Sequence, residues 1–501
     1  MNFNINDMKL NLIAIIALSI GFFSCKKNEN KQNEAENQPY KKPNIIYILA
    51  DDLGYGDLSC YGQTKFSTPN IDKLASQGML FTQHYSGSTV CAPSRSTLMT
   101  GMHTGHTVIR GNKVRRNNKE LLEGQFPLPD KTYTLPEMLK EKGYKTGAFG
   151  KWGLGFPGSE GDPVNQGFDT FFGYNCQRLG HNYYPYHLWS NKDSIVLAGN
   201  AGKKKGTYGP DLIHKQTLKF IEDNKADPFF LYVASIIPHA ELVAPEKILE
   251  NFRGSYEPEN RFEGVDAGPE FRNGPYGSQE ECHATFAAMV SILDQQVGEI
   301  IDKVKMLGLD KNTLIVFTSD NGPHQEGGAD PAYFNSNGAL KGHKRDLYEG
   351  GIRVPMIVSW PGKVKANTQT DHISAFWDVF PTFASLVEVD IPSDIDGISF
   401  LPTLLSSSKK QKQHQFLYWE FHEKGGRQAV RMGDWKGVKY NVLNNSNTGI
   451  ELYDLSKDIE EKNDIANEHP RIVKEIEKFM ETARTPSEVF AFQQQTYLSK
   501  L

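Results

Sequence analysis

The sequence predicts an α/β protein with a large mixed, mostly parallel sheet flanked by helices, followed by a small α+β subdomain with an antiparallel sheet. Three observations carry this prediction. Apolar runs rich in β-branched residues recur through residues 43–391 and alternate with helical patterns, as in parallel sheets covered on both faces. Residues 392–501 hold only short strand-like pieces and one charged helical pattern. The chain of 501 residues is 38% hydrophobic, which is enough for a sizeable core.

The N-terminal segment is predicted to export the protein. Residues 10–23 form an apolar run that is too short to span a bilayer but has the length of the hydrophobic part of a signal peptide. Ser24-Cys25 follows directly and resembles a bacterial lipobox, in which Cys25 would carry the lipid; ordinary secretion is the alternative. We therefore expect a signal peptide over residues 1–24 and a polar tether over residues 25–42. The protein would be held on the periplasmic or outer face of a membrane by its lipid anchor only.

The catalytic domain is expected over residues 43–391, with strands and helices in alternation. Its apolar runs lie at residues 44–50, 146–149, 228–234, 313–318 and 354–360. Helical patterns lie at residues 70–77, 134–142, 279–307 and 375–388, and the third keeps the 3-4 spacing of one buried face. In such sheets, ligands bind beyond the C-terminal ends of the strands.

The C-terminal subdomain is expected over residues 392–501. It begins with a polar, turn-rich stretch and continues with pieces that read as an antiparallel sheet and one helix. The strand-like pieces lie at residues 416–421, 427–432, 436–440 and 451–455, and the helical pattern at residues 471–484.

Composition excludes several classes of function. The 55 basic and 60 acidic residues nearly cancel, and the basic residues do not gather into a nucleic-acid-binding stripe, so no nucleic-acid partner is expected. The 5 cysteines are too few and too scattered for a disulfide scaffold, and they lack the short paired spacing of a zinc site.

Polar residues follow three of the predicted strands and are expected to meet at one edge of the sheet. Asp51-Asp52 ends the first strand, His239 follows the third, and Asp320-Asn321 ends the fourth. Each acidic pair alone could be a turn. Together they offer four hard oxygen atoms, which suit Ca²⁺ better than zinc or copper.

Cys91 lies at the start of a predicted helix in the segment Cys91-Ala-Pro-Ser-Arg95-Ser-Thr-Leu-Met-Thr-Gly101. The helix dipole and Arg95 would make its thiol more acidic, although a buried structural cysteine is equally compatible with the residues alone. The pattern closely resembles the signature of the type I sulfatases, arylsulfatase-like enzymes of the alkaline-phosphatase-like superfamily, and the resemblance runs from about residue 43 through the C-terminal subdomain.

The resemblance implies a sulfuric ester hydrolase in which Cys91 is oxidised to formylglycine by a formylglycine-generating or sulfatase-maturating enzyme. The formylglycine hydrate would attack sulfur, and its remaining hydroxyl would expel sulfate and regenerate the aldehyde. One Ca²⁺ would be held by Asp51, Asp52, Asp320, Asn321 and formylglycine-91. Arg95 matches the arginine that supports the formylglycine, Lys151 and Lys341 match lysines that contact the sulfate, and His239 matches the histidine near the leaving oxygen.

One departure from the family pattern concerns Gly153. The family has Gly-Lys-Trp-His-Leu-Gly where this chain has Gly150-Lys-Trp-Gly-Leu-Gly155, and that histidine helps to break down the covalent sulfate intermediate. His103 and His106 are the nearest candidates by sequence to replace it. They could do so only if the segment after the helix turns back toward Cys91, because a straight helix would leave His103 about 18 Å away.

The aromatic segment at residues 177–189, with His181 and Tyr184, suits a sugar-binding pocket, although packing between loop and domain explains any single ring equally well. The predicted substrates are O-sulfated carbohydrates of a polysaccharide, with galactose-type residues favoured. Two alternatives stay open at this point: a phosphonate or phosphodiester hydrolase of the same superfamily, and a non-enzymatic glycan-binding lipoprotein.

Overall fold

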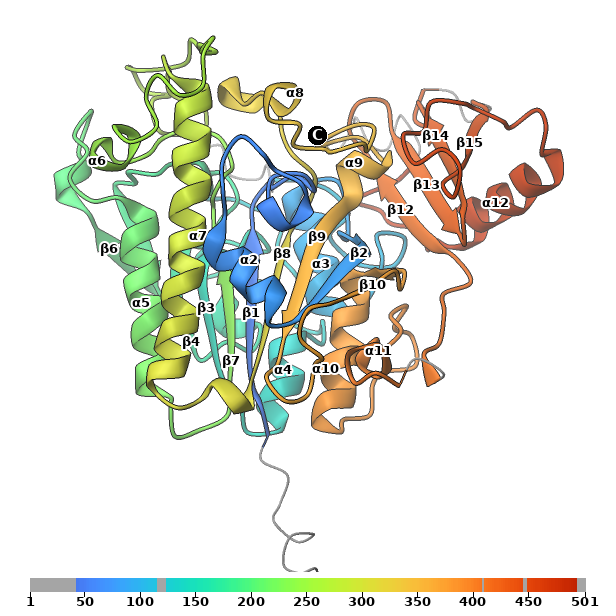
Figure 1. Ribbon diagram of the computed structural model, residues 1–501, viewed down its shortest axis with the longest axis horizontal. Helices are drawn as coiled ribbons and strands as arrows, with labels where there is room; N and C mark the ends of the chain where they lie inside the picture. Colours follow the sequence, from blue (N-terminus) through green and yellow to red (C-terminus); the bar gives the residue numbers. More distant parts are fainter. Residues whose placement is uncertain (1–41, 115–122, 408–409, 445–447, 493–501) are drawn as a thin grey trace, which may run out of the picture. The chain divides into compact units, whose positions relative to one another are not determined.

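The computed structural model describes residues 42–114, 123–407, 410–444 and 448–492 (Figure 1). The predicted signal peptide, Cys25 and all but the last residue of the tether lie outside these ranges. From Pro43 onward, the described residues form one compact unit. Within the described ranges, no helix has both the length and the apolar character that crossing a membrane requires.

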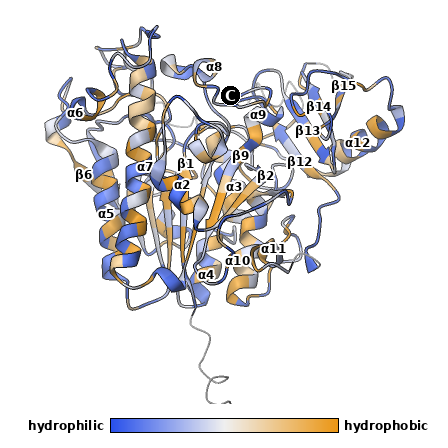
Figure 2. Ribbon diagram, viewed as in Figure 1, coloured by the Kyte–Doolittle hydropathy of each residue, from blue (hydrophilic) through white to orange (hydrophobic). Residues whose placement is uncertain are grey.

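The larger sheet has eleven strands, and β1 (Asn44–Ala50) lies near its centre. All seven residues of β1 are buried, as its unbroken apolar sequence predicts for a strand covered on both faces. Figure 2 shows hydrophobic strands running through this part of the molecule. The strand order is β10 (Thr368–Thr370), β2 (Met79–Tyr85), β9 (Arg353–Ser359), β8 (Thr313–Ser319), β1, β7 (Phe229–Ala234), β3 (Lys145–Lys151), β4 (Thr170–Tyr174), β5 (His187–Ser190) and β6 (Asp193–Val196), with β11 (Ser374–Ala375) paired to β2.

The central strands run parallel, which places their carboxyl ends at one edge. Strand β1 pairs in parallel with β7 and β8, and β3 pairs in parallel with β7 and β4. Strand β9 is antiparallel to β8, as are β2 to β9 and β5 to β4. The expected mixed, mostly parallel sheet is therefore confirmed, with its antiparallel pairings confined to the flanks.

Helices cover both faces of this sheet. Alternate side chains of β1 enter two different cores, Ile46 and Ile48 on one face and Ile45 and Tyr47 on the other. The first core is covered by α2 (Pro69–Ser76), α5 (Gly209–Asp223) and α7 (Cys282–Met306). The second is covered by α3 (Cys91–Thr100), α4 (Leu135–Glu141) and α10 (Val379–Val387). The shorter helices are α6 (Glu246–Leu249), α8 (Pro331–Phe334), α9 (Glu349–Ile352) and α11 (Leu401–Leu404).

The second sheet is antiparallel and has four strands, β12 (Leu417–Phe421), β13 (Arg427–Met432), β14 (Trp435–Tyr440) and β15 (Ile450–Asp454). One face packs on α12 (Pro470–Thr482) through Ile476 and Met480. The other face joins a core shared with the larger sheet, in which Trp419 contacts Trp377 and Tyr85. The predicted α+β subdomain with an antiparallel sheet is thus present (Figure 1).

Candidate active site

The ends of β1 and β8 bring two pairs of polar residues together. Asp51 and Asp52 follow β1, Asp320 and Asn321 follow β8, and all four side chains are fully buried. The backbone of the two strand ends stays joined, because the Asp320 amide donates to the Ala50 carbonyl at 3.1 Å. The Asp52 amide in turn donates to Oδ1 of Asp320 at 3.1 Å. Parallel pairing of the two strands therefore determines which polar residues meet.

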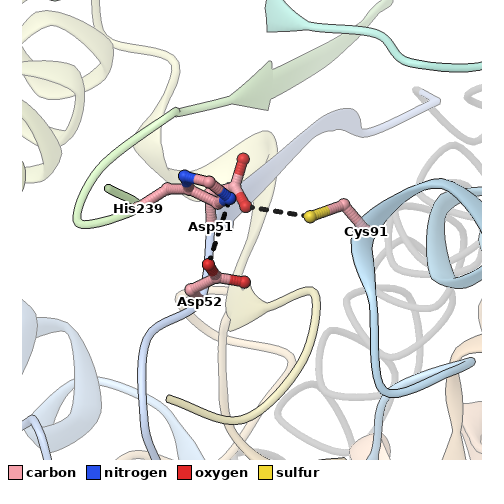
Figure 3. A group of neighbouring side chains, drawn as sticks. All are labelled: Asp51, Asp52, Cys91 and His239. Carbon is pink, nitrogen blue, oxygen red and sulfur yellow. Dashed lines mark hydrogen bonds and ion pairs between the residues drawn. The ribbon is translucent and has the colours of Figure 1, made fainter. Parts of the chain in front are cut away.

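Cys91 enters this group from the first turn of α3. Its Sγ lies 3.3 Å from Oδ1 of Asp51, and Figure 3 shows the sulfur facing that carboxylate, with His239 and Asp52 beside it. Arg95 lies one turn further along α3. Its guanidinium donates to Oδ2 of Asp320 at 2.7 Å and to Oδ2 of Asp51 at 3.2 Å, so one helix positions both the sulfur and the cation that joins the two strand ends.

Lys151, the last residue of β3, places an ammonium between a carboxylate and the sulfur. Its Nζ lies 2.6 Å from Oδ2 of Asp51 and 3.5 Å from Sγ of Cys91. Burial opposes the ionisation of Asp51, but the charges around it, first that of Lys151 and also that of Arg95, outweigh burial and lower the pKa of Asp51 to about 2.

Lys344 and His239 form the other side of the group. The Nζ of Lys344 lies 2.7 Å from Oδ2 of Asp52, 3.0 Å from Nε2 of His239 and 3.0 Å from Oε2 of Glu326. The Nδ1 of His239 bonds the carbonyl of Ala240, so Nδ1 carries the proton and Nε2 accepts from Lys344. Burial and the two nearby ammonium groups, first that of Lys344, hold the pKa of His239 well below its usual range. His239 is therefore neutral at neutral pH.

Two further histidines stack on His239. The ring of His181 lies 4.4 Å from it on one side, and that of His324 lies 5.6 Å away. Burial, with a contribution from Lys151, lowers the pKa of His181 to about 3. The three stacked imidazole rings thus form an uncharged surface next to the ammonium groups of Lys151 and Lys344.

The oxygen atoms at the strand ends fit a hard cation. Ligand atoms of Asp51, Asp52, Cys91 and His239 all lie within 4.8 Å of one another. The Oδ1 of Asn321 is buried and has no hydrogen-bond partner in the described parts of the chain, whereas its Nδ2 donates to Asp52 at 2.6 Å. Burial and the charge of Asp51 raise the pKa of Asp320 to about 6. An additional positive charge would relieve both the unpartnered oxygen and the crowded carboxylates.

Comparison with known proteins assigns this arrangement to a family. A family model described as Sulfatase matches residues 43–389, and one described as N-sulphoglucosamine sulphohydrolase, C-terminal, matches residues 342–485. The chain belongs to the sulfatase family. As a member, this sulfatase is a sulfuric ester hydrolase with an alkaline-phosphatase-like fold.

Relatives and solved structures match most of the sulfatase. It is 31% identical to the N-acetylgalactosamine-6-O-sulfatase of Bacteroides thetaiotaomicron, over 95% of this chain and 98% of the relative. It is 34% identical to the N-acetylgalactosamine-6-sulfatase of Rattus norvegicus, over 72% of this chain and 66% of the relative. The crystal structure of Ps i-CgsB in complex with k-i-k-neocarrahexaose superposes with a TM-score of 0.73 at 28% identity, covering 92% of this chain and 98% of that one.

The Cys91 thiol of the sulfatase is not acidified as its sequence context predicts. Burial, the charge of Asp51 and that of Asp320 raise its pKa, and Lys151 only partly offsets them. The prediction considered the helix dipole and Arg95 but not the carboxylates, to which the guanidinium is already bound. Cys91 is therefore a protonated thiol, which is a poor nucleophile.

Lys341 does not reach the group around Cys91; Lys344 takes that place. The Nζ of Lys341 donates to the Glu461 carbonyl at 3.0 Å and to the Tyr453 hydroxyl at 3.3 Å, both in the C-terminal subdomain. The two lysines are three residues apart in a polar loop without helical or strand periodicity. No pattern in the sequence therefore separates Lys344 from Lys341. No pattern marks Glu326 as a site residue either, and it was not predicted.

His103 and His106 lie away from Cys91, beyond the opposite end of α3. The helix runs without a break from Cys91 to Thr100, and the chain then turns toward Asp396 and the C-terminal subdomain. The Nδ1 of His106 lies 2.9 Å from Asp396, and the His103 ring packs 5.3 Å from that of Tyr418. The chain turns back along α3 only after His106, since Thr107 bonds Ser96 at 2.6 Å and Asn112 accepts from the Ala92 amide at 3.0 Å. The structure therefore leaves both histidines beside Asp396 and does not bring them to Cys91.

The space next to Gly153 is filled by Gln177. Gly153 has a φ of +78°, and a Cβ built on it would lie 2.5 Å from Oε1 of Gln177. That oxygen is buried without a hydrogen-bond partner in the described ranges. From the same aromatic segment, His181 joins the site as described, whereas Tyr184 packs 5.5 Å from the ring of Tyr208 in the core.

Proposed function

We propose that this sulfatase removes O-sulfate groups from sugars of a polysaccharide, with galactose-type residues as the preferred sulfated sugar. The observation that supports it best is the position of the Cys91 side chain, between Asp51 and the ammonium of Lys151. A sulfate ester is an anion, and fixed cations next to the reacting atom favour both its binding and the charge that develops in the transition state. The relatives named above act, by their names, on a 6-sulfate of N-acetylgalactosamine, a galactose-type sugar.

We infer that one Ca²⁺ binds at the strand ends. Asp51 and Asp52, whose oxygens belong to one buried ligand group, would hold it with Asp320 and the unpartnered Oδ1 of Asn321 from the neighbouring strand end. Hard oxygen ligands of this kind favour Ca²⁺. When bound, the cation supplies a fixed positive charge next to the sulfate oxygens. Arg95 would keep Asp51 and Asp320 oriented toward that cation, since it already donates to both carboxylates.

We also infer that Cys91 is converted to formylglycine by a maturation enzyme. The raised pKa of the thiol supports this, because the unmodified side chain is a protonated and weak nucleophile. When present, the hydrated aldehyde supplies a hydroxyl for attack on sulfur. Lys151, 3.5 Å from the side-chain atom of residue 91, would then lie beside the sulfate.

Lys344 is the residue best placed to hold a proton near the leaving alcohol oxygen. Neutral His239 uses its only proton for the Ala240 carbonyl, so its Nε2 accepts rather than donates. Burial opposes the charge of Lys344, but Asp52 outweighs it and raises the pKa of the ammonium, which keeps it protonated. His239 would orient Lys344, and the stacked ring of His181 would keep water from this side of the site.

A substrate panel tests the proposed activity. The protein is produced with a maturation enzyme and given galactose-type and glucose-type sugars sulfated at defined positions, an aryl sulfate, and matched phosphate and phosphonate esters. We expect the highest kcat/KM for a galactose-type sulfate. Equal or higher kcat/KM for a phosphate or phosphonate ester would contradict the proposed reaction, and a preference for glucose-type sugars would contradict the proposed substrate.

We further propose that the protein is exported and anchored by lipid on Cys25. The lipobox-like Ser24-Cys25 after an apolar run supports this. We expect Cys25→Ser to move the protein from the membrane fraction to a soluble exported form, because a lipid anchor supplies stable attachment and a polar tether does not. Fractionation followed by immunoblotting measures this, with Cys282→Ser as the control. If as much Cys25→Ser protein as wild-type protein stays in the membrane fraction, then another part of the chain attaches the protein to the membrane.

A further inference from the structure

Residues 341–346, which we call the lysine loop, contact both the active site and the C-terminal sheet. Lys344 points into the site, where it contacts Asp52 and His239, and its amide donates to the Pro323 carbonyl at 2.8 Å. Its side chain is 3% exposed, so this position is fully enclosed by its neighbours. The loop itself has no regular secondary structure. Besides the bond of the Lys344 amide, the Arg345 amide donates to the Thr89 carbonyl at 3.1 Å, and side chains from the C-terminal sheet add further contacts at both ends of the loop.

One contact with the C-terminal sheet is made by Lys341 at the start of the loop. Its ammonium lies 3.8 Å from the centroid of the Tyr348 ring and donates to the Tyr453 hydroxyl and the Glu461 carbonyl. Tyr453 belongs to β15. Lys341 thus binds the loop to the second sheet three residues before Lys344.

A second contact is made by Arg427, the first residue of β13, at the end of the loop. Its guanidinium donates to the Arg345 carbonyl and, at 2.6 Å, to Oδ1 of Asp346. Arg345 has a φ of +77°, a left-handed conformation that a residue with a side chain rarely adopts. A conformation of this kind persists only where surrounding contacts hold it, and Arg427 supplies such a contact directly after Lys344.

We propose that the four-stranded C-terminal sheet positions Lys344 for catalysis, with Arg427 and Lys341 as its positioning residues. This inference rests on the proposed function, in which Lys344 acts at the leaving oxygen. The C-terminal sheet would then contribute to catalysis by holding Lys344 in position.

Arg427→Met is the principal test, with Arg427→Lys as the conservative variant. Misplacing Lys344 by about 1 Å should lower kcat by about 10- to 100-fold with little change in KM, and Arg427→Lys should recover part of this loss. Lys439→Met is the matched control. It removes a cation from the neighbouring strand β14 that lies 3.9 Å from Glu477 of α12, and it should leave kcat unchanged.

A second measurement does not depend on activity. Brief treatment with acetic anhydride, followed by peptide mass spectrometry, reports how accessible each lysine amine is. We expect little labelling of Lys344 in the wild-type protein, about tenfold more in Arg427→Met and wild-type labelling in Lys439→Met. A folded Arg427→Met protein with wild-type kcat and protected Lys344 would overturn the proposal.

Lys341→Met decides the question if Arg427→Met fails to fold, and Lys341→Arg is its conservative partner. Lower kcat together with greater Lys344 labelling in Lys341→Met, both reversed in Lys341→Arg, would support the positioning role. Unchanged values would refute it. If the wild-type protein hydrolyses no sulfate ester but the labelling differences still appear, then the proposed function fails while the positioning of Lys344 by the sheet stands.

Discussion

Histidines and carboxylates cluster near both ends of α3, but only the cluster at its start is proposed to be reactive. At its start, Cys91 joins carboxylates and His239; past its end, His103 and His106 meet Asp396. Ten residues of helix separate the two groups, about 15 Å along the axis. Histidines and carboxylates alone therefore do not distinguish a reactive group from a structural one.

The difference lies in which atoms lack partners. At the second group, the Gly105 amide donates to Nδ1 of His103 at 3.1 Å, which leaves the proton on Nε2 next to Asp396. A metal at Nε2 would need that amide bond broken, since a neutral imidazole has one free lone pair. At the first group, Asn321 keeps a buried oxygen without a partner in the described ranges. The unpartnered oxygen of Asn321 beside three carboxylates therefore favours a metal site at the first group, where residue types alone do not separate the two groups.

The largest effect is expected at the start of α3. Cys91→Ala removes the residue that the proposed nucleophile comes from, so kcat/KM should fall by about 10⁴-fold or more while the protein stays folded. Steady-state kinetics and circular dichroism measure this. Cys282→Ala, which alters another buried cysteine, is the control and should keep its activity. Comparable losses in both variants would show that the effect is structural.

A second large effect is expected at the metal site. Wild-type thermal stability should rise with added Ca²⁺, by about 2.7 kcal/mol at 100 times the Kd. Asp320→Ala should lose this response and about 100-fold or more in kcat/KM, because the carboxylate is both a proposed ligand and a partner of Arg95. Thermal melts and metal analysis measure it. Full calcium content in Asp320→Ala would remove this residue from the ligand set.

A smaller effect, on stability alone, is expected beyond the end of α3. Asp396→Asn should lower the free energy of unfolding by about 1–3 kcal/mol, because the carboxylate accepts from the His103 amide and contacts both histidine rings. Its kcat/KM should stay within about threefold of wild type, and no sulfated enzyme should accumulate. Denaturant melts and intact-protein mass spectrometry measure these. Accumulation of sulfated enzyme in Asp396→Asn would instead indicate that His103, His106 or Asp396 takes part in catalysis.

The smallest effect is expected at Asp57, in the loop that follows Asp52. Burial raises its pKa from 3.8 to about 6, so its contribution to stability is complete below about pH 4 and is lost as the pH rises through 6. Asp57→Asn should therefore match wild type near pH 4.5 and be more stable at pH 8, by about 2 kcal/mol. Melts across this pH range measure it. The calcium response should persist, and its loss would place Asp57 among the ligands.

The sheet, and the meeting of the polar residues at one of its edges, could be predicted from the sequence because each rests on a local pattern. The apolar run of β1 ends directly at Asp51, and that of β8 ends one residue before Asp320, so parallel pairing brings the carboxylates together. The placement of Lys344 depends instead on Arg427 and Tyr453, which follow it by more than 80 residues. Contacts between residues so far apart in the sequence produce no local pattern in residues 341–346, so the position of Lys344 could not be predicted from the sequence.

The direction of the Cys91 pKa was missed for a related reason. The helix start and Arg95 are visible in one short segment, but the desolvation and the carboxylates that outweigh them come from other strands. His103 and His106 were likewise placed by proximity in sequence. The rigid helix between them and Cys91 makes that proximity misleading, since each added residue of a helix increases the distance.

If Cys91 is matured as proposed, its full burial limits when the modification can take place. A modifying enzyme must reach the side chain, and in the folded protein the strand ends and Lys151 close it off. On the proposed chemistry, conversion therefore takes place during biosynthesis, while the segment around Cys91 is still unfolded. The fraction of active molecules is then set at the moment of folding. On the same proposal, a maturation enzyme that meets the folded protein could not reach Cys91, and molecules that folded with an unmodified Cys91 would stay inactive until they unfold.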